Sequence, residues 1–241
     1  PADCGPACLS LSQDVQGEIY EYPEEFFKER VHVIRRPRPD DFQIKEAAEK
    51  IKNSINPILI SGGGVFYSDA MDDLSNFATK HNIPVTQTVM GYSTMKRDHS
   101  HFVGPIGGLG GKAANNLAKK TDLAIAVGTK LADFTTGSWA NFENPNFSLV
   151  NINVSRFDAN KHMARSVIGD AKVTLQELSN ALGNWKASND WYDLSRKELN
   201  SWNEYVDKES GPTNQELPSY AHAVGAIYRN ADPTDIAVTA A

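Results

Sequence analysis

The chain has 241 residues, of which 40% are hydrophobic and 22% charged, and this is enough apolar sequence for one large core. Its formal net charge of -6 is spread along the chain without long runs of Lys or Arg, so no nucleic acid partner is expected. No apolar stretch approaches the roughly 18–20 residues that cross a bilayer, and no leader pattern opens the sequence, so we expect a cytoplasmic protein without a membrane partner.

The first predicted element is a strand over the apolar run Ala7–Leu11. A segment rich in Glu, Arg and Pro follows it and ends with Pro37 and Pro39. These prolines disfavour helix in the residues before them and remove two backbone donors, so the segment is expected to be an extended linker. A domain boundary is therefore predicted at residue 40.

An alternation of helices and strands begins after the linker. The predicted elements are, in chain order, a helix over 44–51, a strand over 57–61, a helix over 71–78, a strand over 83–89, a helix over 112–119, strands over 122–128 and 148–154, and a helix over 175–182. Ser68 or Asp69 is expected to cap the second helix. The strands are nearly continuous apolar runs, which is typical of a sheet covered on both faces. The sequence therefore predicts an α/β fold with a doubly wound parallel sheet over residues 40–185.

The last part of the chain carries two further helical patterns. A polar amphipathic helix over 188–210 is interpreted as a linker, and a helix over 219–230 leads into a final strand over 235–241. The apolar runs at both ends look like strands cut from their sheets. We therefore expect the chain to be an internal piece of a larger enzyme.

The first candidate site is the strand–helix junction at Gly62, Gly63 and Gly64, where backbone N–H groups can approach an anion. A dinucleotide fingerprint would have a third glycine at position 67, where Tyr67 stands. A structural tight turn and a cofactor contact both remain open for these three glycines.

A second glycine-rich stretch contains Gly107 and Gly108 before a helix. It departs from the phosphate-binding loop because Ile106 holds the position of the motif's first glycine and Ala113 replaces its hydroxyl residue. Close approach of a ligand or partner chain and a purely structural role are both open here as well.

Asp133, Thr135 and Thr136 lie just beyond the strand 122–128, where an open sheet has its ligand crevice, so they are further candidates for ligand binding, and Asp133 for cofactor binding. His99 and His101 lack a third ligand at a familiar metal spacing and are expected in a solvated loop. The sequence offers no catalytic residue and no metal ligand.

One set of stretches resembles the thiamine-diphosphate enzymes of the acetolactate synthase group: Gly5–Val15, Ile58–Gly64, Gly107–Gly108 and Asp122–Gly128. A second set resembles, more specifically, the hydrolases of that group that act on a trihydroxycyclohexanedione in inositol breakdown: Gln13–Glu18, Tyr22–Glu24, Asn214–Ile227 and Thr239–Ala241. The resemblance implies an order of pyrimidine-binding, middle and pyrophosphate-binding domains. Residues 1–39 would then be the last strand of the first domain plus a linker, 40–185 the middle domain, and 186–241 a linker helix and the start of the third domain.

The same resemblance implies that the parent enzyme uses thiamine diphosphate and magnesium to cleave a carbon–carbon bond of a small ketonic ring with water. The catalytic glutamate and the magnesium motif of that family are absent from this chain, so the chain alone is expected to be inactive. The parent is expected to be a homodimer or homotetramer.

Some relatives place FAD against the middle domain near positions that correspond to Gly62–Gly64, Gly107–Gly108 and Asp133. Flavin-bearing synthases tend to have an Arg after that aspartate, whereas this chain has Thr135–Gly137, which argues against FAD. Two alternatives stay open: the middle domain of another thiamine-diphosphate enzyme, such as an acetolactate synthase, and a free-standing nucleotide-binding module.

Overall fold

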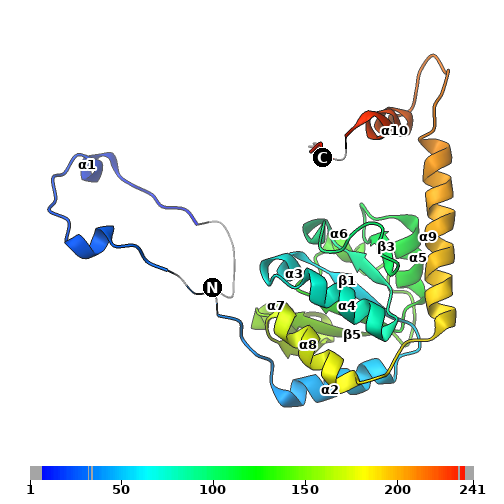
Figure 1. Cartoon of the computed structure of the whole chain (residues 1–241), viewed down its shortest axis with the longest axis horizontal. Coiled ribbons are helices and arrows are strands. Elements are labelled where there is room, and N and C mark those ends of the chain that lie inside the picture. Colours follow the sequence, from blue (N-terminus) through cyan, green and yellow to red (C-terminus); the bar gives the residue numbers. More distant parts are fainter. Residues whose placement is uncertain (1–6, 32, 34, 233, 237–241) are drawn as a thin grey trace.

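Six parallel strands form the centre of the computed structural model, which describes residues 7–31, 33, 35–232 and 234–236. The strands are β1 (Pro57–Ser61), β2 (Val85–Gln87), β3 (Phe102–Pro105), β4 (Leu123–Val127), β5 (Ser148–Asn153) and β6 (Arg165–Ile168). Their order is β3-β2-β1-β4-β5-β6, so the direction of winding reverses between β1 and β4 (Figure 1). This confirms the predicted doubly wound parallel α/β sheet.

Side chains alternate between the two faces of the sheet, and each face is covered by helices. Leu59 and Ile125 pack on the face beneath α2 (Asp41–Lys52), α4 (Met71–His81) and α8 (Ala171–Leu182). Ile58 and Ala124 pack on the other face, beneath α5 (Lys112–Lys120) and α9 (Asn189–Glu209), which lie side by side in Figure 1. The central strands β1 and β4 are almost entirely apolar because both of their faces are buried.

Shorter elements connect this framework. They are α1 (Gln13–Gln16), α3 (Gly63–Tyr67), α6 (Asp133–Thr136), α7 (Arg156–Ala159), the longer terminal α10 (Tyr220–Asn230), and three single turns of 3₁₀ helix, Glu24–Phe27, Val89–Gly91 and Lys161–Met163. Among the described residues, no helix is long and apolar enough to span a membrane.

Several local predictions differ from the structure. The strand predicted over 83–89 is shorter, because Thr88 already caps the turn that follows β2 and accepts the N–H of Gly91 at 3.0 Å. The cap predicted at Ser68 or Asp69 is wrong, since Ala70 precedes α4 and makes no side-chain cap. Asp69 instead has a positive φ of 53° and pairs with Lys172.

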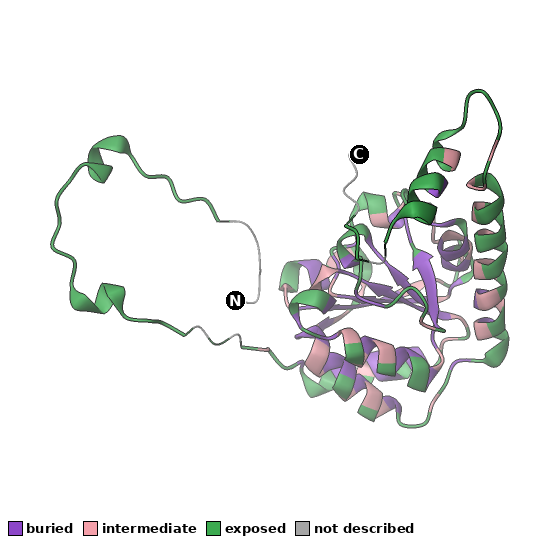
Figure 2. Cartoon of the chain, turned by 45° about the horizontal axis from the view of Figure 1, so that its top comes forward, coloured by how far each residue is buried: buried purple, intermediate pink, exposed green. Residues whose placement is uncertain are grey.

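The strand predicted over Ala7–Leu11 is wrong for these residues, which are exposed and not in a strand. A strand needs a hydrogen-bonded neighbour, and within the described residues none lies beside this run. Most of the strand predicted over 235–241 lies outside the described residues. Figure 2 shows the described part of 7–31 as exposed along its length.

The helix predicted over 188–210 is confirmed as α9, and it is closely attached to the sheet. Trp191 is buried, and its indole N–H donates to the carbonyl oxygen of Pro57 at the start of β1, at 2.8 Å. Ser195, one turn later, is also buried. The domain boundary predicted after residue 185 remains a prediction.

Candidate functional site

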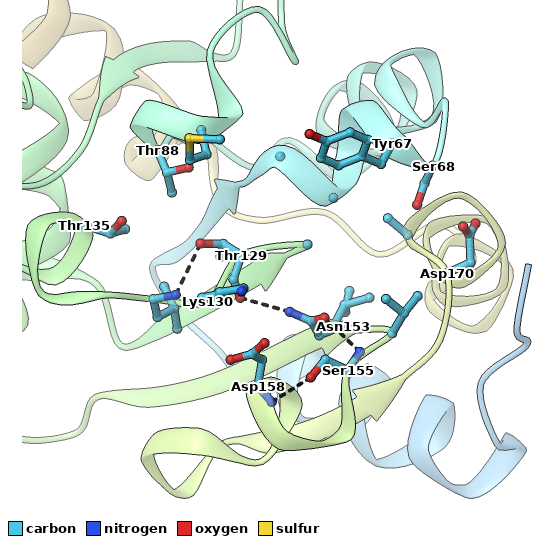
Figure 3. A pocket seen from close by; sticks show the side chains of 18 of the residues that line it. Tyr67, Ser68, Thr88, Thr129, Lys130, Thr135, Asn153, Ser155, Asp158 and Asp170 are labelled. Carbon is cyan, nitrogen blue, oxygen red and sulfur yellow. Dashed lines mark hydrogen bonds between the residues drawn. The ribbon is translucent and has the colours of Figure 1, made fainter. Parts of the chain in front are cut away.

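A cavity of about 780 Å³ lies at the carboxyl edge of the sheet, where the strand order reverses (Figure 3). Open α/β sheets bind ligands at this point because the loops on either side of the reversal diverge. Loops after five strands and one stretch of linker form its wall: Gly63–Gly64, Thr88–Met90, Gly128–Ala132, Asn153–Ser155, Gly169–Ala171, and Arg35 with Pro37.

The ends of β1 and β4 touch through backbone alone. The N–H of Gly64 donates to the carbonyl oxygen of Gly128 at 2.9 Å, and a Cβ added to Gly64 would lie 2.6 Å from the Cα of Gly128. A Cβ at Gly62 would lie 2.4 Å from the same carbonyl oxygen. Gly62 and Gly64 are thus required for the close packing of the two strand ends. Of the three glycines, Gly63 and Gly64 line the cavity and Gly62 does not.

The second glycine-rich loop packs against α6. Gly107 has a φ of +106°, and a Cβ there would lie 2.0 Å from the carbonyl oxygen of Phe134. Gly108 donates its N–H to that oxygen at 2.7 Å. Neither glycine lines the cavity, and neither does Asp133, which is exposed at the start of α6, although its neighbours Phe134 and Thr135 do. A cofactor role for Gly107, Gly108 and Asp133 stays a prediction.

Polar side chains that the sequence analysis missed form the floor between β4 and β5. Asn153 at the end of β5 donates to the carbonyl oxygen of Thr129 at 3.1 Å and accepts the N–H of Ser155 at 3.0 Å. The Ser155 hydroxyl caps α7 by accepting the N–H of Asp158 (Figure 3). These bonds hold the wall rigid without a ligand. The rule that singled out Asp133, a polar residue directly after a strand, also applies to Asn153.

The charges on the cavity wall that have no salt-bridge partner among the described residues are positive. Asp158 and Asp170 line it, but each is paired, with Lys161 and Arg36 respectively. Arg35 and Lys130 line it too, and neither forms a salt bridge with any described residue. Unpaired cations in a concave wall favour an anionic ligand.

The histidine pair lies outside this cavity. His101 is buried, so the expectation of a solvated loop is wrong for it, and its Nε2 faces the Oδ1 of Asn82 at 3.2 Å. Burial lowers the pKa of His101 to about 4, with smaller contributions from His99 and Arg196. In the part of the chain that the structure describes, no three His, Cys, Asp or Glu side chains gather as a metal site.

The family model for the thiamine pyrophosphate enzyme central domain matches residues 44–178, which include all six strands. Proteins named 3D-(3,5/4)-trihydroxycyclohexane-1,2-dione hydrolase are among the curated relatives. The one from Clostridium perfringens strain 13 is 48% identical over 178 residues, covering 74% of this chain and 28% of the relative. The one from Clostridium tetani is 43% identical over 221 residues, covering 88% and 34%, and the one from Geobacillus thermodenitrificans is 39% identical over 237 residues, covering 94% and 37%.

The chain therefore spans about a third of the length of these relatives. The family match covers more than half of the 241 residues and coincides with the doubly wound sheet. The chain belongs to the thiamine pyrophosphate enzyme family, of which it contains the central domain.

Proposed function

We propose that this chain serves as the central part of a thiamine-diphosphate-dependent hydrolase that cleaves a ring carbon–carbon bond of a trihydroxycyclohexanedione in inositol breakdown. The observation that supports it is the identity of 39–48% over 74–94% of the chain with relatives that carry one and the same name. The alignment with the Geobacillus thermodenitrificans relative covers 94% of the chain and therefore includes residues on both sides of the sheet. Proteins that share only a fold need not be similar in such flanking segments.

The magnesium motif that the resemblance implies is absent from the sequence. Among the residues that the structure describes, no three His, Cys, Asp or Glu side chains gather in a way that could hold a metal ion. We therefore propose that thiamine diphosphate and magnesium are held by other parts of the whole protein, and that this chain contributes the scaffold between them. A homodimer or homotetramer of the whole protein is part of the same proposal.

A chimera tests the proposal. The aligned part of this chain would replace the matching 178-residue stretch of the Clostridium perfringens relative, and release of the ring-opened product would be followed with thiamine diphosphate and magnesium present. We expect turnover of the trihydroxycyclohexanedione. The matched control is the same chimera with the middle domain of an acetolactate synthase. Turnover by that control alone, with both chimeras folded, would contradict the proposal and favour the alternative that this chain serves another thiamine-diphosphate enzyme.

A second candidate function rests on the cavity. We propose that it binds a nucleotide-type cofactor, with Gly63 and Gly64 approaching the ligand through their backbone and Lys130 facing its charge. Gly62, Gly107, Gly108 and Asp133 would then act by shaping the surrounding loops. The absence of an Arg over 135–137 disfavours FAD, so ADP and NAD are the first ligands to test.

The thermal midpoint with FAD, NAD or ADP tests this candidate, because a ligand of the folded state stabilises it with the logarithm of its excess over the dissociation constant. We expect a rise for at least one nucleotide, which Lys130→Gln reduces while the unliganded midpoint is unchanged. No rise for any of the three at millimolar concentration would overturn it.

A further inference from the structure

The last residues of the linker, Arg35–Pro39, are fastened to the domain and are called the strap here. The Arg36 guanidinium donates to the carbonyl oxygen of Ser68, at the end of α3, and to the carboxylate of Asp170, at 3.0 Å. Asp170 precedes α8, so this one side chain ties the linker to two helices on the same side of the cavity (Figure 3).

The backbone of the strap is bound at the same place. The carbonyl oxygen of Pro37 accepts the N–H of Asp170 at 2.8 Å. Pro39 is buried, and a Cβ added to Gly169 would lie 3.0 Å from its ring. Gly169 thus leaves the room in which the strap lies.

The carboxylate of Asp170 has two functions. One oxygen caps α8 by accepting the N–H of Lys172 at 3.0 Å, and the other accepts from Arg36. Its side chain is only 7% exposed, so its charge is shielded from water and the bond to Arg36 is a charge-assisted one. The cap does not depend on the strap, so α8 can keep its N-terminus when Arg36 leaves.

The strap also forms part of the cavity wall, since Arg35 and Pro37 line it. On the N-terminal side of the strap, residues 7–31 are exposed. A segment with few buried apolar groups and a small number of anchoring bonds opens at a lower free energy than the sheet unfolds.

We propose that the strap is a movable wall of the cavity: it closes the cavity when Arg36 is bound to Ser68 and Asp170, and release of Arg36 opens the cavity while the sheet stays folded. The proposal uses the cavity of the second candidate function but does not depend on which ligand enters it.

Limited trypsin digestion of the whole chain tests the strap. Trypsin cuts after Arg or Lys unless proline follows, so the bonds after Arg36 and Arg38 are resistant and only the Arg35–Arg36 bond reports on the strap. The Arg30–Val31 bond, in the exposed segment, is an internal reference. We expect mass spectrometry to show much slower cleavage after Arg35 than after Arg30 in the native chain.

Arg36→Gln removes the charge-assisted bonds and keeps the scissile bond after Arg35. We expect cleavage there to rise about tenfold, as loss of a charged hydrogen bond implies, with cleavage after Arg30 unchanged. Arg38→Gln is the matched control, because the Arg38 side chain is 73% exposed and its salt bridge within the described residues is the one with Glu177. It should leave both rates unchanged.

Amide hydrogen exchange provides a second readout that does not depend on the protease. The N–H of Asp170 donates to the strap and that of Thr174 donates within α8, so Arg36→Gln should speed exchange at Asp170 alone. Equal cleavage after Arg35 and Arg30 in the native chain, or exchange at Asp170 and Thr174 that rises together, would overturn the proposal. No ligand is added, so failure here is separate from failure of nucleotide binding.

Discussion

The contact between Gly64 and Gly128 decides whether β1 and β4 can end side by side. Neither residue has room for a side chain, because the nearest atoms are backbone atoms that cannot rotate away. Gly63, the residue between Gly62 and Gly64, differs: a Cβ there would lie 3.0 Å from the carbonyl oxygen of Met90, on a surface loop that can shift.

Gly64→Ala is therefore expected to lower the free energy of unfolding by about 2–4 kcal/mol, the cost of overpacking against backbone. Gly63→Ala is the control and should cost clearly less. Urea unfolding followed by circular dichroism measures both. Equal losses would show that the glycines are there for loop flexibility and not for the contact with β4.

The ring of His101, the residue before β3, contacts side chains of neighbouring elements in its neutral form. Its ring faces Asn82, stacks on Tyr192 with centroids 4.8 Å apart, and lies near His99 and the cation of Arg196. No carboxylate among the described residues bonds to it, so nothing offsets the burial that lowers its pKa to about 4.

The lowered pKa predicts a pH dependence of stability. Between the ordinary pKa of about 6.5 and the folded pKa of about 4, the unfolded chain binds a proton at His101 that the folded chain does not, so stability falls as the pH drops through this window. We expect His101→Gln to remove a loss on the order of 2 kcal/mol between pH 7 and pH 5. Urea unfolding at the two pH values, compared between native chain and variant, measures it. An identical pH dependence in both would mean that His101 has the same pKa in the folded and unfolded chain, and would contradict the prediction.

At the scale of elements, α9 is held to the sheet by Trp191. The indole N–H bonds to Pro57, and the ring completes the apolar face that Ile58 and Leu117 share. Trp191→Phe should cost about 1–2 kcal/mol, because the carbonyl oxygen of Pro57 loses its partner. Trp191→Ala should cost about 3–5 kcal/mol, because a cavity forms as well.

Thermal and urea unfolding of both variants test this assignment. If α9 is only a linker, as the sequence analysis interpreted it, both variants should unfold like the native chain. If it is part of the core, Trp191→Ala should also loosen α5, which would be seen as faster amide exchange of Leu117.

The elements that could be predicted from the sequence are those with strong local signals. The strands β1 and β4 are almost entirely apolar, β5 contains the apolar residues Leu149, Val150 and Ile152, and α2, α8 and α9 have clear helical spacing. The strands β3 and β6 were missed, because β3 is four residues long and contains Gly104 and Pro105, and β6 begins with the exposed Arg165. Such edge strands are specified by their pairing with β2 and β5 more than by their own composition.

The position of the candidate site could be predicted from the sequence better than the residues that line it. The glycines after β1 mark the correct edge of the sheet, and Gly63 and Gly64 line the cavity. Asn153, the last residue of β5, and Ser155, just after it, also line the cavity and were missed, because an isolated Asn or Ser gives no motif. The contribution of Arg35 could not have been foreseen, since the strap reaches the cavity through contacts with residues more than a hundred positions away in the chain.

At the scale of the whole molecule, the central sheet is complete in this chain while the chain spans about a third of its relatives. The cavity, the strap and the α9 contact all lie within it. The residues of this chain thus form one doubly wound layer by themselves, and the proposal above assigns the reacting groups to other parts of the whole protein.

This assignment predicts that the chain by itself does not bind thiamine diphosphate. The magnesium motif that the resemblance implies is absent from the sequence, and no three His, Cys, Asp or Glu side chains of the described residues gather as a metal site. Isothermal titration calorimetry of the chain with thiamine diphosphate and magnesium should show no saturable heat, while the full-length Clostridium perfringens relative, measured in the same buffer, should.

Saturable binding that disappears with a magnesium chelator would overturn the prediction and place the diphosphate site inside this chain. The cavity would then be the first place to look, and Lys130→Gln would distinguish it, because loss of that cation weakens an anion bound there and leaves a site elsewhere unchanged.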